Sequence, residues 1–181
     1  MKSHVVKRLN VARALDAIRT AKPVDAFEAA KWLETHDRRV PAGSLMDIAS
    51  DKRCAMWNRI AAIYTVGFLS RRPGIAPRLI ALLADPQENV RIRGQAAESL
   101  AYYREKSAIP LLRKILLSRE RPGLKVECIF ALSKMWEWND DLKTFNPSAR
   151  KALNEFARTQ PTGKADRELK RSMRGIHLGW I

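Results

Sequence analysis

A segment of about 33 residues recurs along this chain, and this repetition limits the fold more than any other feature of the sequence. The clearest copy is Ile92–Leu100, where a basic residue is followed by small apolar residues and a closing leucine. The closing positions, Leu33, Val66, Leu100 and Leu132, are spaced 33, 34 and 32 residues apart. Apolar stretches containing proline, Pro77–Leu83 and Pro110–Leu117, precede two copies at the same spacing. Each copy therefore predicts two helices, which must stack on their neighbours because one helical hairpin cannot bury its apolar face alone.

These copies resemble the HEAT repeat family in its short bacterial form, which has the pattern Asp, then Val-Arg-x-x-Ala-Ala-x-Ala-Leu. The resemblance is strongest over residues 75–118 and extends more weakly over 42–74 and 119–136. It implies an all-α fold, an α-solenoid of about five stacked helical hairpins that forms a single domain over residues 1–181. Within that domain we expect three parts: an N-terminal cap and degenerate repeat over 1–40, core repeats over 41–145, and C-terminal capping helices over 146–181.

The same resemblance implies a structural ladder in which acidic and basic side chains pair between neighbouring repeats. Its members would be Asp51, Arg59, Asp85, Arg93 and Lys125. Asp85 also precedes a proline and stands three residues before Glu88, which is typical of a capped helix start. We therefore expect a helix to begin at Asp85, with Glu88 in its first turn.

HEAT arrays present the second helix of each hairpin on a concave inner surface, and this register selects a column of candidate partner-binding residues. The column comprises Trp57, Tyr64, Phe68, Arg91, Glu98, Tyr102, Phe130, Lys134, Trp136 and Trp138. Exposed aromatic side chains on such a surface favour binding to another macromolecule. The alternative is that Trp57 and Tyr64 fill gaps against the first hairpin, since such side chains are often buried.

The sequence contains none of the common nucleotide, zinc-protease or serine-hydrolase motifs. Its three histidines lie in different repeats, which disfavours a zinc site. We expect no cofactor and no metal, and the absence of these motifs favours a non-enzymatic role without deciding the question of catalysis. Two enzymatic alternatives remain. The first is an alkylpurine DNA glycosylase, because that class combines aromatic residues with a catalytic Asp, and this chain has Trp136 and Trp138 beside Asp140 and Asp141. The second is a tetrapyrrole lyase, because some of these lyases use similar short repeats.

The net charge of +15 is spread evenly, because each third of the chain carries +5. The densest group of cations lies in a predicted last helix over 164–175 and comprises Lys164, Arg167, Lys170, Arg171 and Arg174. This charge favours an acidic protein or peptide partner, with nucleic acid as the alternative, although a solvated capping face has the same composition. The longest uncharged run, Ile60–Ser70, is too short to cross a bilayer, and no signal peptide is evident, so we expect a cytoplasmic location.

Overall fold

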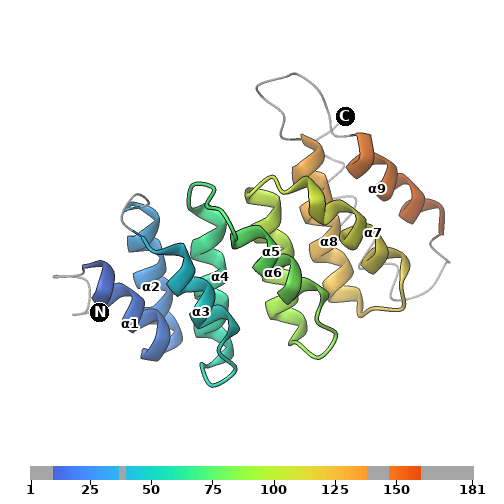
Figure 1. The fold of residues 1–181 in the computed structure, drawn as a ribbon. Coiled ribbons are helices and arrows are strands. Elements are labelled where there is room, and N and C mark those ends of the chain that lie inside the picture. Colours follow the sequence, from blue (N-terminus) through green and yellow to red (C-terminus); the bar gives the residue numbers. More distant parts are fainter. Residues whose placement is uncertain (1–9, 37–39, 138–146, 160–181) are drawn as a thin grey trace.

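The computed structural model describes residues 10–36, 40–137 and 147–159, and within these ranges every regular element is a helix (Figure 1). The elements are α1 (Val11–Thr20), α2 (Pro23–Glu34), α3 (Ala42–Ser50), α4 (Met56–Phe68), α5 (Ile75–Ala84), α6 (Val90–Tyr102), the short 3₁₀ helix η3 (Lys106–Ala108), α7 (Ile109–Leu117), α8 (Pro122–Glu137) and α9 (Pro147–Thr159). None of the described helices is both long and apolar enough to cross a membrane.

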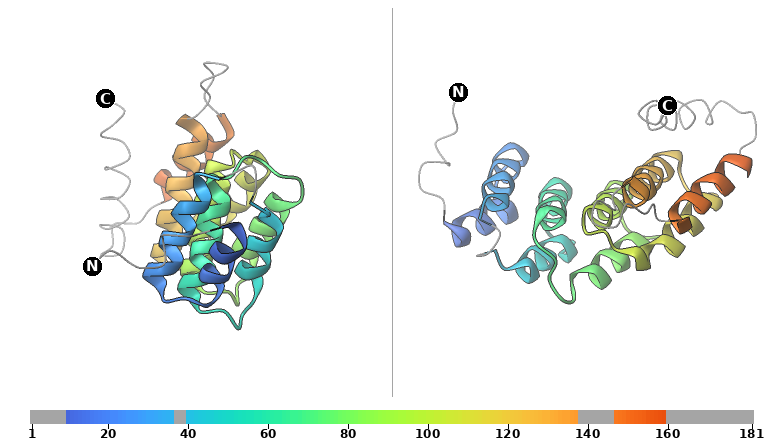
Figure 2. Two further views of the ribbon diagram at one scale, coloured as in Figure 1. Left: turned by 90° about the vertical axis from the view of Figure 1, so that its left-hand side faces the viewer. Right: turned by 90° about the horizontal axis from the view of Figure 1, so that it is seen from above.

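Consecutive helices pair as hairpins, and the hairpins stack in one direction to form a curved array. The helices α2, α4, α6 and α8 pack side by side in one row, and α1, α3, α5 and α7 form the second row behind them. The view from above in Figure 2 places the first row on the concave side of the arc. We call the two rows the inner and outer helices. The architecture confirms the predicted HEAT-like solenoid.

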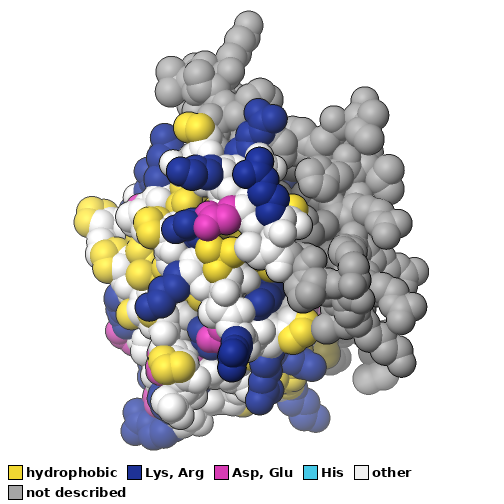
Figure 3. Space-filling view, turned by 90° about the vertical axis from the view of Figure 1, so that its right-hand side faces the viewer, with side chains coloured by type: hydrophobic (Ala, Val, Ile, Leu, Met, Phe, Trp, Pro, Cys, Tyr) yellow, Lys and Arg dark blue, Asp and Glu magenta, His cyan; other side chains and the backbone are white. Residues whose placement is uncertain are grey.

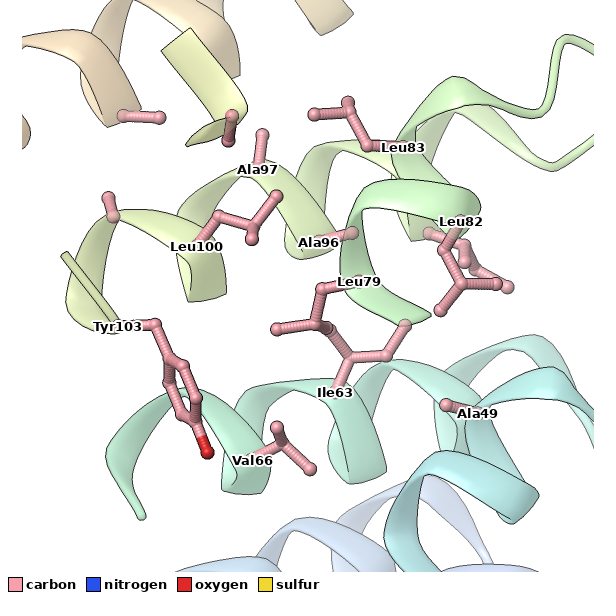
Figure 4. Packing of buried hydrophobic residues seen from close by; sticks show 14 of the residues in the cluster. Ala49, Ile63, Val66, Leu79, Leu82, Leu83, Ala96, Ala97, Leu100 and Tyr103 are labelled. Carbon is pink, nitrogen blue, oxygen red and sulfur yellow. The ribbon is translucent and has the colours of Figure 1, made fainter. Parts of the chain in front are cut away.

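The core lies between the two rows and is continuous from α1 to α9. Leu79 and Leu83 of α5 point at the small residues of α6, and Ile63 of α4 meets them from the preceding hairpin (Figure 4). Each fully buried leucine or isoleucine contributes about 1.5–3 kcal/mol relative to an exposed one. Because neighbouring hairpins share these side chains, no hairpin holds a complete core by itself.

Small residues set the distance between adjacent inner helices. A Cβ at Gly67 of α4 would lie 2.8 Å from the hydroxyl oxygen of Ser99 and 3.1 Å from its Cα. Ser99 in turn donates a hydrogen bond of 2.9 Å to the carbonyl oxygen of Ile63. The backbones of α4 and α6 therefore approach closely, and their outward side chains form one continuous surface.

An inter-repeat ladder exists, but the arginines do not bind the predicted aspartates. Arg59 donates to the carbonyl oxygen of Ala49 at 2.7 Å and binds both carboxylate oxygens of Glu88 in the next repeat. Arg93 repeats the arrangement, with bonds of 3.0 Å to the carbonyl oxygen of Leu83 and 2.8 Å to Glu120. The acidic partner in both cases is a glutamate from the loop between the two helices of the following hairpin.

The predicted aspartates of the ladder serve local roles instead. Asp51 binds the side chain and backbone of Arg53, two residues away. Asp85 accepts a bond of 2.9 Å from the amide of Gln87 and lies 3.9 Å from the Lys52 ammonium group. Lys125, the third basic position, has its ammonium 5.9 Å from the ring centroid of Phe156. The ladder thus has two rungs, formed by Arg59 and Arg93.

The helix start predicted at Asp85 is wrong. Asp85 is the C-cap of α5, and α6 begins five residues later at Val90, where the side chain of Asn89 caps it by accepting from the Arg91 amide at 2.9 Å. Glu88 consequently lies ahead of the helix in the loop, and this position lets its carboxylate reach Arg59.

Both ends of the described array bury apolar side chains against the neighbouring hairpin. Ala14 and Ile18 of α1 are fully buried, as predicted for the N-terminal end. At the other end, α9 packs on α7 and α8 through Ala149, Ala152 and Phe156. The predicted last helix over 164–175 lies outside the described residues.

Candidate functional site

Five aromatic rings form a continuous chain of contacts across the four inner helices. We call this set, Phe27, Tyr64, Phe68, Tyr102 and Phe130, the aromatic stripe. Successive ring centroids are 6.2, 4.8, 4.6 and 6.5 Å apart. All four distances lie close to or within the range at which aromatic pairs attract each other, so the rings hold one another in place.

The stripe is partly open to solvent. Phe68 is 42% exposed, and the other four rings are half-buried. Trp57, on the same inner helix as Tyr64 and Phe68, is 39% exposed. Half-exposed rings that are fixed by their neighbours offer apolar area to a ligand at little cost in side-chain entropy.

Two hollows flank Trp57 on the inner surface. One, of about 470 Å³, lies between α2 and α4 and includes Val24, Phe27 and Lys31. The other, of about 410 Å³, lies between α4, α6 and α8, with Arg91, Glu98 and Glu127 among its lining residues. Trp57 contributes to the wall of both, so the inner surface is a sequence of depressions separated by aromatic side chains.

Burial and hydrogen bonding shift the pKa values of ionisable groups along the stripe. Burial raises the pKa of the Tyr64 hydroxyl above its ordinary value, with the nearby carboxylate of Glu34 as a second cause. Burial also raises the pKa of Glu34, although its hydrogen bond with Tyr64 opposes that shift. Burial raises the pKa of Tyr102 as well. The hydrogen bond between Tyr64 and Glu34 thus links inner helices α4 and α2 beside the stripe.

The structure brings most of the predicted column together. Trp57, Tyr64, Phe68, Arg91, Glu98, Tyr102, Phe130 and Lys134 all lie on inner helices with exposed or half-buried side chains. The Arg91 guanidinium carbon lies 5.1 Å from the centroid of the Trp57 ring, and the Lys134 ammonium lies 5.8 Å from that of Phe130. The alternative that Trp57 and Tyr64 only fill gaps is partly right for Tyr64, whose ring contacts Phe27 of the first hairpin edge-on.

Several predicted residues lie outside the described part of the chain. They are the side chain of Trp136, together with Trp138, Asp140, Asp141, Lys164, Arg167, Lys170, Arg171 and Arg174. The catalytic and basic-helix hypotheses that rest on them remain predictions.

Phe27, the first ring of the stripe, was missed by the sequence register. A shift of 33 residues from Tyr64 leads to Lys31, one turn further along α2 than Phe27. Phe27 and Lys31 lie on the same face of α2 and line the same hollow, so the first repeat places its ring one turn earlier than the register predicts. An aromatic residue within one helical turn of the expected position is the sequence signal that identifies Phe27.

The described residues hold no group of three or more His, Cys, Asp or Glu side chains placed to bind a metal ion. His36 stacks on the ring of Trp32 at a centroid distance of 3.9 Å. Cys54 and Cys128 are both free; Cys128 is buried in α8, whereas Cys54 is half-buried in the turn before α4. The described histidine and cysteine positions are thus accounted for by packing.

A comparison with known protein families gives one result. The family described as HEAT repeats matches two overlapping segments of the chain, residues 42–133 and 76–169. No curated protein matches the sequence. The two segments together span α3 to α9, which includes every ring of the stripe except Phe27.

Proposed function

The chain belongs to the HEAT repeat family, and from this premise we propose that it is a non-enzymatic scaffold that holds a segment of another protein on its inner surface. Stacked repeats of this kind create extended concave surfaces that serve protein interaction. A rigid surface also binds without ordering loops first, which lowers the entropic cost of association. The proposed mechanism is therefore preorganisation of a curved surface.

The aromatic stripe is the observation that carries this proposal. Its rings extend over four successive helices, and Phe68 at the middle remains 42% exposed. Aromatic side chains contribute most of the binding energy in many protein interfaces, where a few such residues dominate. A stripe with no partner leaves this apolar area in contact with water, which is unfavourable by about 25 cal/mol for each Å².

A matched pair of substitutions tests the proposal. Phe68 on inner helix α4 and Leu117 on outer helix α7 are exposed to similar extents, 42% and 38%. The full-length protein and the variants Phe68→Ala, Tyr102→Ala and Leu117→Ala are used as bait in lysate of the native cell, and bound proteins are quantified by mass spectrometry. We expect one defined protein to be lost from both stripe variants and kept by Leu117→Ala. Equal recovery by all three variants contradicts the proposal.

A second surface favours the acidic partner that the net charge predicts. A hollow of about 460 Å³ between α7 and α9 is lined by Arg113, Arg150, Lys151 and Arg158 with a single carboxylate, Glu155. Figure 3 views this end of the molecule and shows many Lys and Arg side chains with few Asp or Glu. Arg113 already binds both oxygens of Glu155 at 2.7 Å, so the support for an acidic partner comes from the other basic side chains of the hollow, among them Lys151 and Arg158.

The expected acidic partner therefore suits this basic end better than the inner surface. Fluorescence anisotropy with a labelled oligoglutamate peptide and with duplex DNA distinguishes a protein partner from nucleic acid. Binding of the peptide that is weakened by Arg158→Ala supports an acidic protein. Binding of DNA alone, with a logarithmic salt dependence of about −0.9 per phosphate neutralised, supports the nucleic-acid alternative instead.

A further inference from the structure

Two glutamates, Glu98 and Glu127, line the hollow between α4, α6 and α8. Glu127 of α8 crosses the backbone of α6 at Gly94, so closely that a Cβ on Gly94 would lie 2.8 Å from the Glu127 Cγ. Glu98 lies one helical turn beyond Gly94 on α6, and both glutamates line the hollow. Gly94 thus leaves room for the Glu127 side chain to pass over α6 at the hollow that Glu98 also lines.

Within the described part of the chain, this pair has no cation of its own. No Lys or Arg there forms an ion pair with Glu98 or Glu127, and Glu98 accepts one bond of 2.7 Å from the amide of Gln95. Arg91 lines the same hollow, but its guanidinium lies over the Trp57 ring. Burial raises the pKa of Glu127, and the charge of Glu98 adds to that shift.

This arrangement is unusual in a chain with a net charge of +15. Two glutamates in the loops between helices, Glu88 and Glu120, each bind an arginine of the preceding repeat. Two carboxylates that line one hollow without an ion pair cost free energy through desolvation and mutual repulsion. A cation supplied by a ligand removes that cost. The inner surface therefore favours a positively charged ligand group, whereas the net charge of the molecule favours a negatively charged one.

We propose that the inner surface binds a polypeptide segment in which a Lys or Arg, held by Glu98 and Glu127, stands beside an apolar side chain on the aromatic stripe. This proposal rests on the proposed function and specifies the chemistry of the partner. The hollow, at about 410 Å³, is within the size range of ordinary ligand sites. Glu98 is close enough to Tyr64 and Tyr102 to influence both hydroxyls, so the two parts of the surface are contiguous.

A peptide selection provides the test, because net charge and local charge predict opposite outcomes. A library of random 12-residue peptides displayed on phage is selected against the full-length protein. A protein of charge +15 attracts acidic peptides through its overall field. We expect the selected peptides to be enriched instead in Lys or Arg adjacent to Leu, Phe or Trp.

The strongest selected peptide is then synthesised with a fluorescent label, and its affinity is measured by anisotropy. We expect Glu98→Gln and Glu127→Gln each to weaken binding about tenfold, which corresponds to about 1.4 kcal/mol. Asp47→Asn is the matched control, since it removes one negative charge from outer helix α3, and we expect it to leave the affinity unchanged. The raised pKa of Glu127 means that its charged form is unfavourable in the folded protein. The Glu127→Gln variant should therefore unfold at no lower urea concentration than the wild type at neutral pH. Retained stability separates lost binding from misfolding.

The outcomes separate this inference from the function on which it rests. Selection of acidic peptides, or unchanged affinity in both glutamine variants, overturns the inference while Tyr102→Ala still weakens binding and supports the scaffold function. Recovery of no peptide, or of peptides that bind Tyr102→Ala equally well, contradicts both. Equal weakening by Asp47→Asn shows that only the overall charge matters and also overturns the inference.

Discussion

Replacement of Arg59 by alanine should destabilise this protein more than the same change at either equivalent position. The side chains of Arg59 and Glu88 are 7% and 5% exposed, so the substitution leaves a carboxylate buried without its cation. It also removes the donor that satisfies the Ala49 carbonyl at the end of α3. Breaking a buried ion pair in this way costs about 3–5 kcal/mol.

The expected cost decreases along the array. Glu120, the partner of Arg93, is 28% exposed, so water partly replaces the lost guanidinium in Arg93→Ala and the loss is about 1.5–3 kcal/mol. Among the described residues, Lys125 contacts the Phe156 ring, and this cation–π contact contributes about 0.5–1 kcal/mol. The predicted order of destabilisation is therefore Arg59, then Arg93, then Lys125.

Urea unfolding followed by circular dichroism at 222 nm measures these differences. With a slope of about 2 kcal/mol per M, a loss of 4 kcal/mol lowers the midpoint by about 2 M. The double variant Arg59→Met/Glu88→Leu serves as the control, because an apolar pair in place of a buried ion pair is often neutral or stabilising. A loss below about 1 kcal/mol in Arg59→Ala, or a larger loss in Lys125→Ala, would refute the reasoning.

Three further predictions concern helix spacing, acid stability and thiol reactivity. Gly67→Ala should lower the unfolding free energy by about 1–3 kcal/mol in urea, because the new Cβ would lie 2.8 Å from the Ser99 hydroxyl oxygen; an unchanged midpoint would contradict the close approach of α4 and α6. The hydrogen bond from Arg93 lowers the pKa of Glu120 below its ordinary value, so this carboxylate should stabilise the protein at neutral pH and lose its contribution as the pH falls through the lowered pKa. The unfolding free energy of Glu120→Gln should therefore be lower than that of the wild type at neutral pH and equal to it in acid, and a difference that does not change with pH would be inconsistent with the pairing. Burial raises the pKa of the Cys128 thiol to about 12, so maleimide should label it only after unfolding, and rapid labelling of the native protein would show that α8 is not packed as described.

The repeat period predicted the fold because equivalent residues in successive repeats pack in the same way. Small residues such as Ala96 and Ala97 recur where inner helices meet, and a 33-residue spacing places them in equivalent positions. The same period placed Tyr64, Phe68 and Tyr102 on one surface. Helical periodicity was thus sufficient to predict which side chains share a surface, where those side chains lie on helices of the well-matched repeats.

The partners that lie in loops were not predicted, because loops keep no fixed register. Glu88 lies three residues after Asp85, whereas Glu120 lies two residues after Ser118 in the next repeat. A pattern of equivalent positions therefore favours the aspartate and misses both glutamates. The pairing of Glu98 with Glu127 depends on the close passage of α8 over Gly94, a tertiary contact that no spacing within one helix specifies.

Site-specific crosslinking most directly tests the central claim that the inner surface holds a protein segment. A benzoylphenylalanine residue is placed at Gln95, which lines the inner hollow, and in a second protein at Ala81, which is exposed on outer helix α5. After irradiation in the native cell, we expect a defined covalent adduct from position 95 and none from position 81. An adduct from position 81 alone, or no adduct from position 95, would contradict the account.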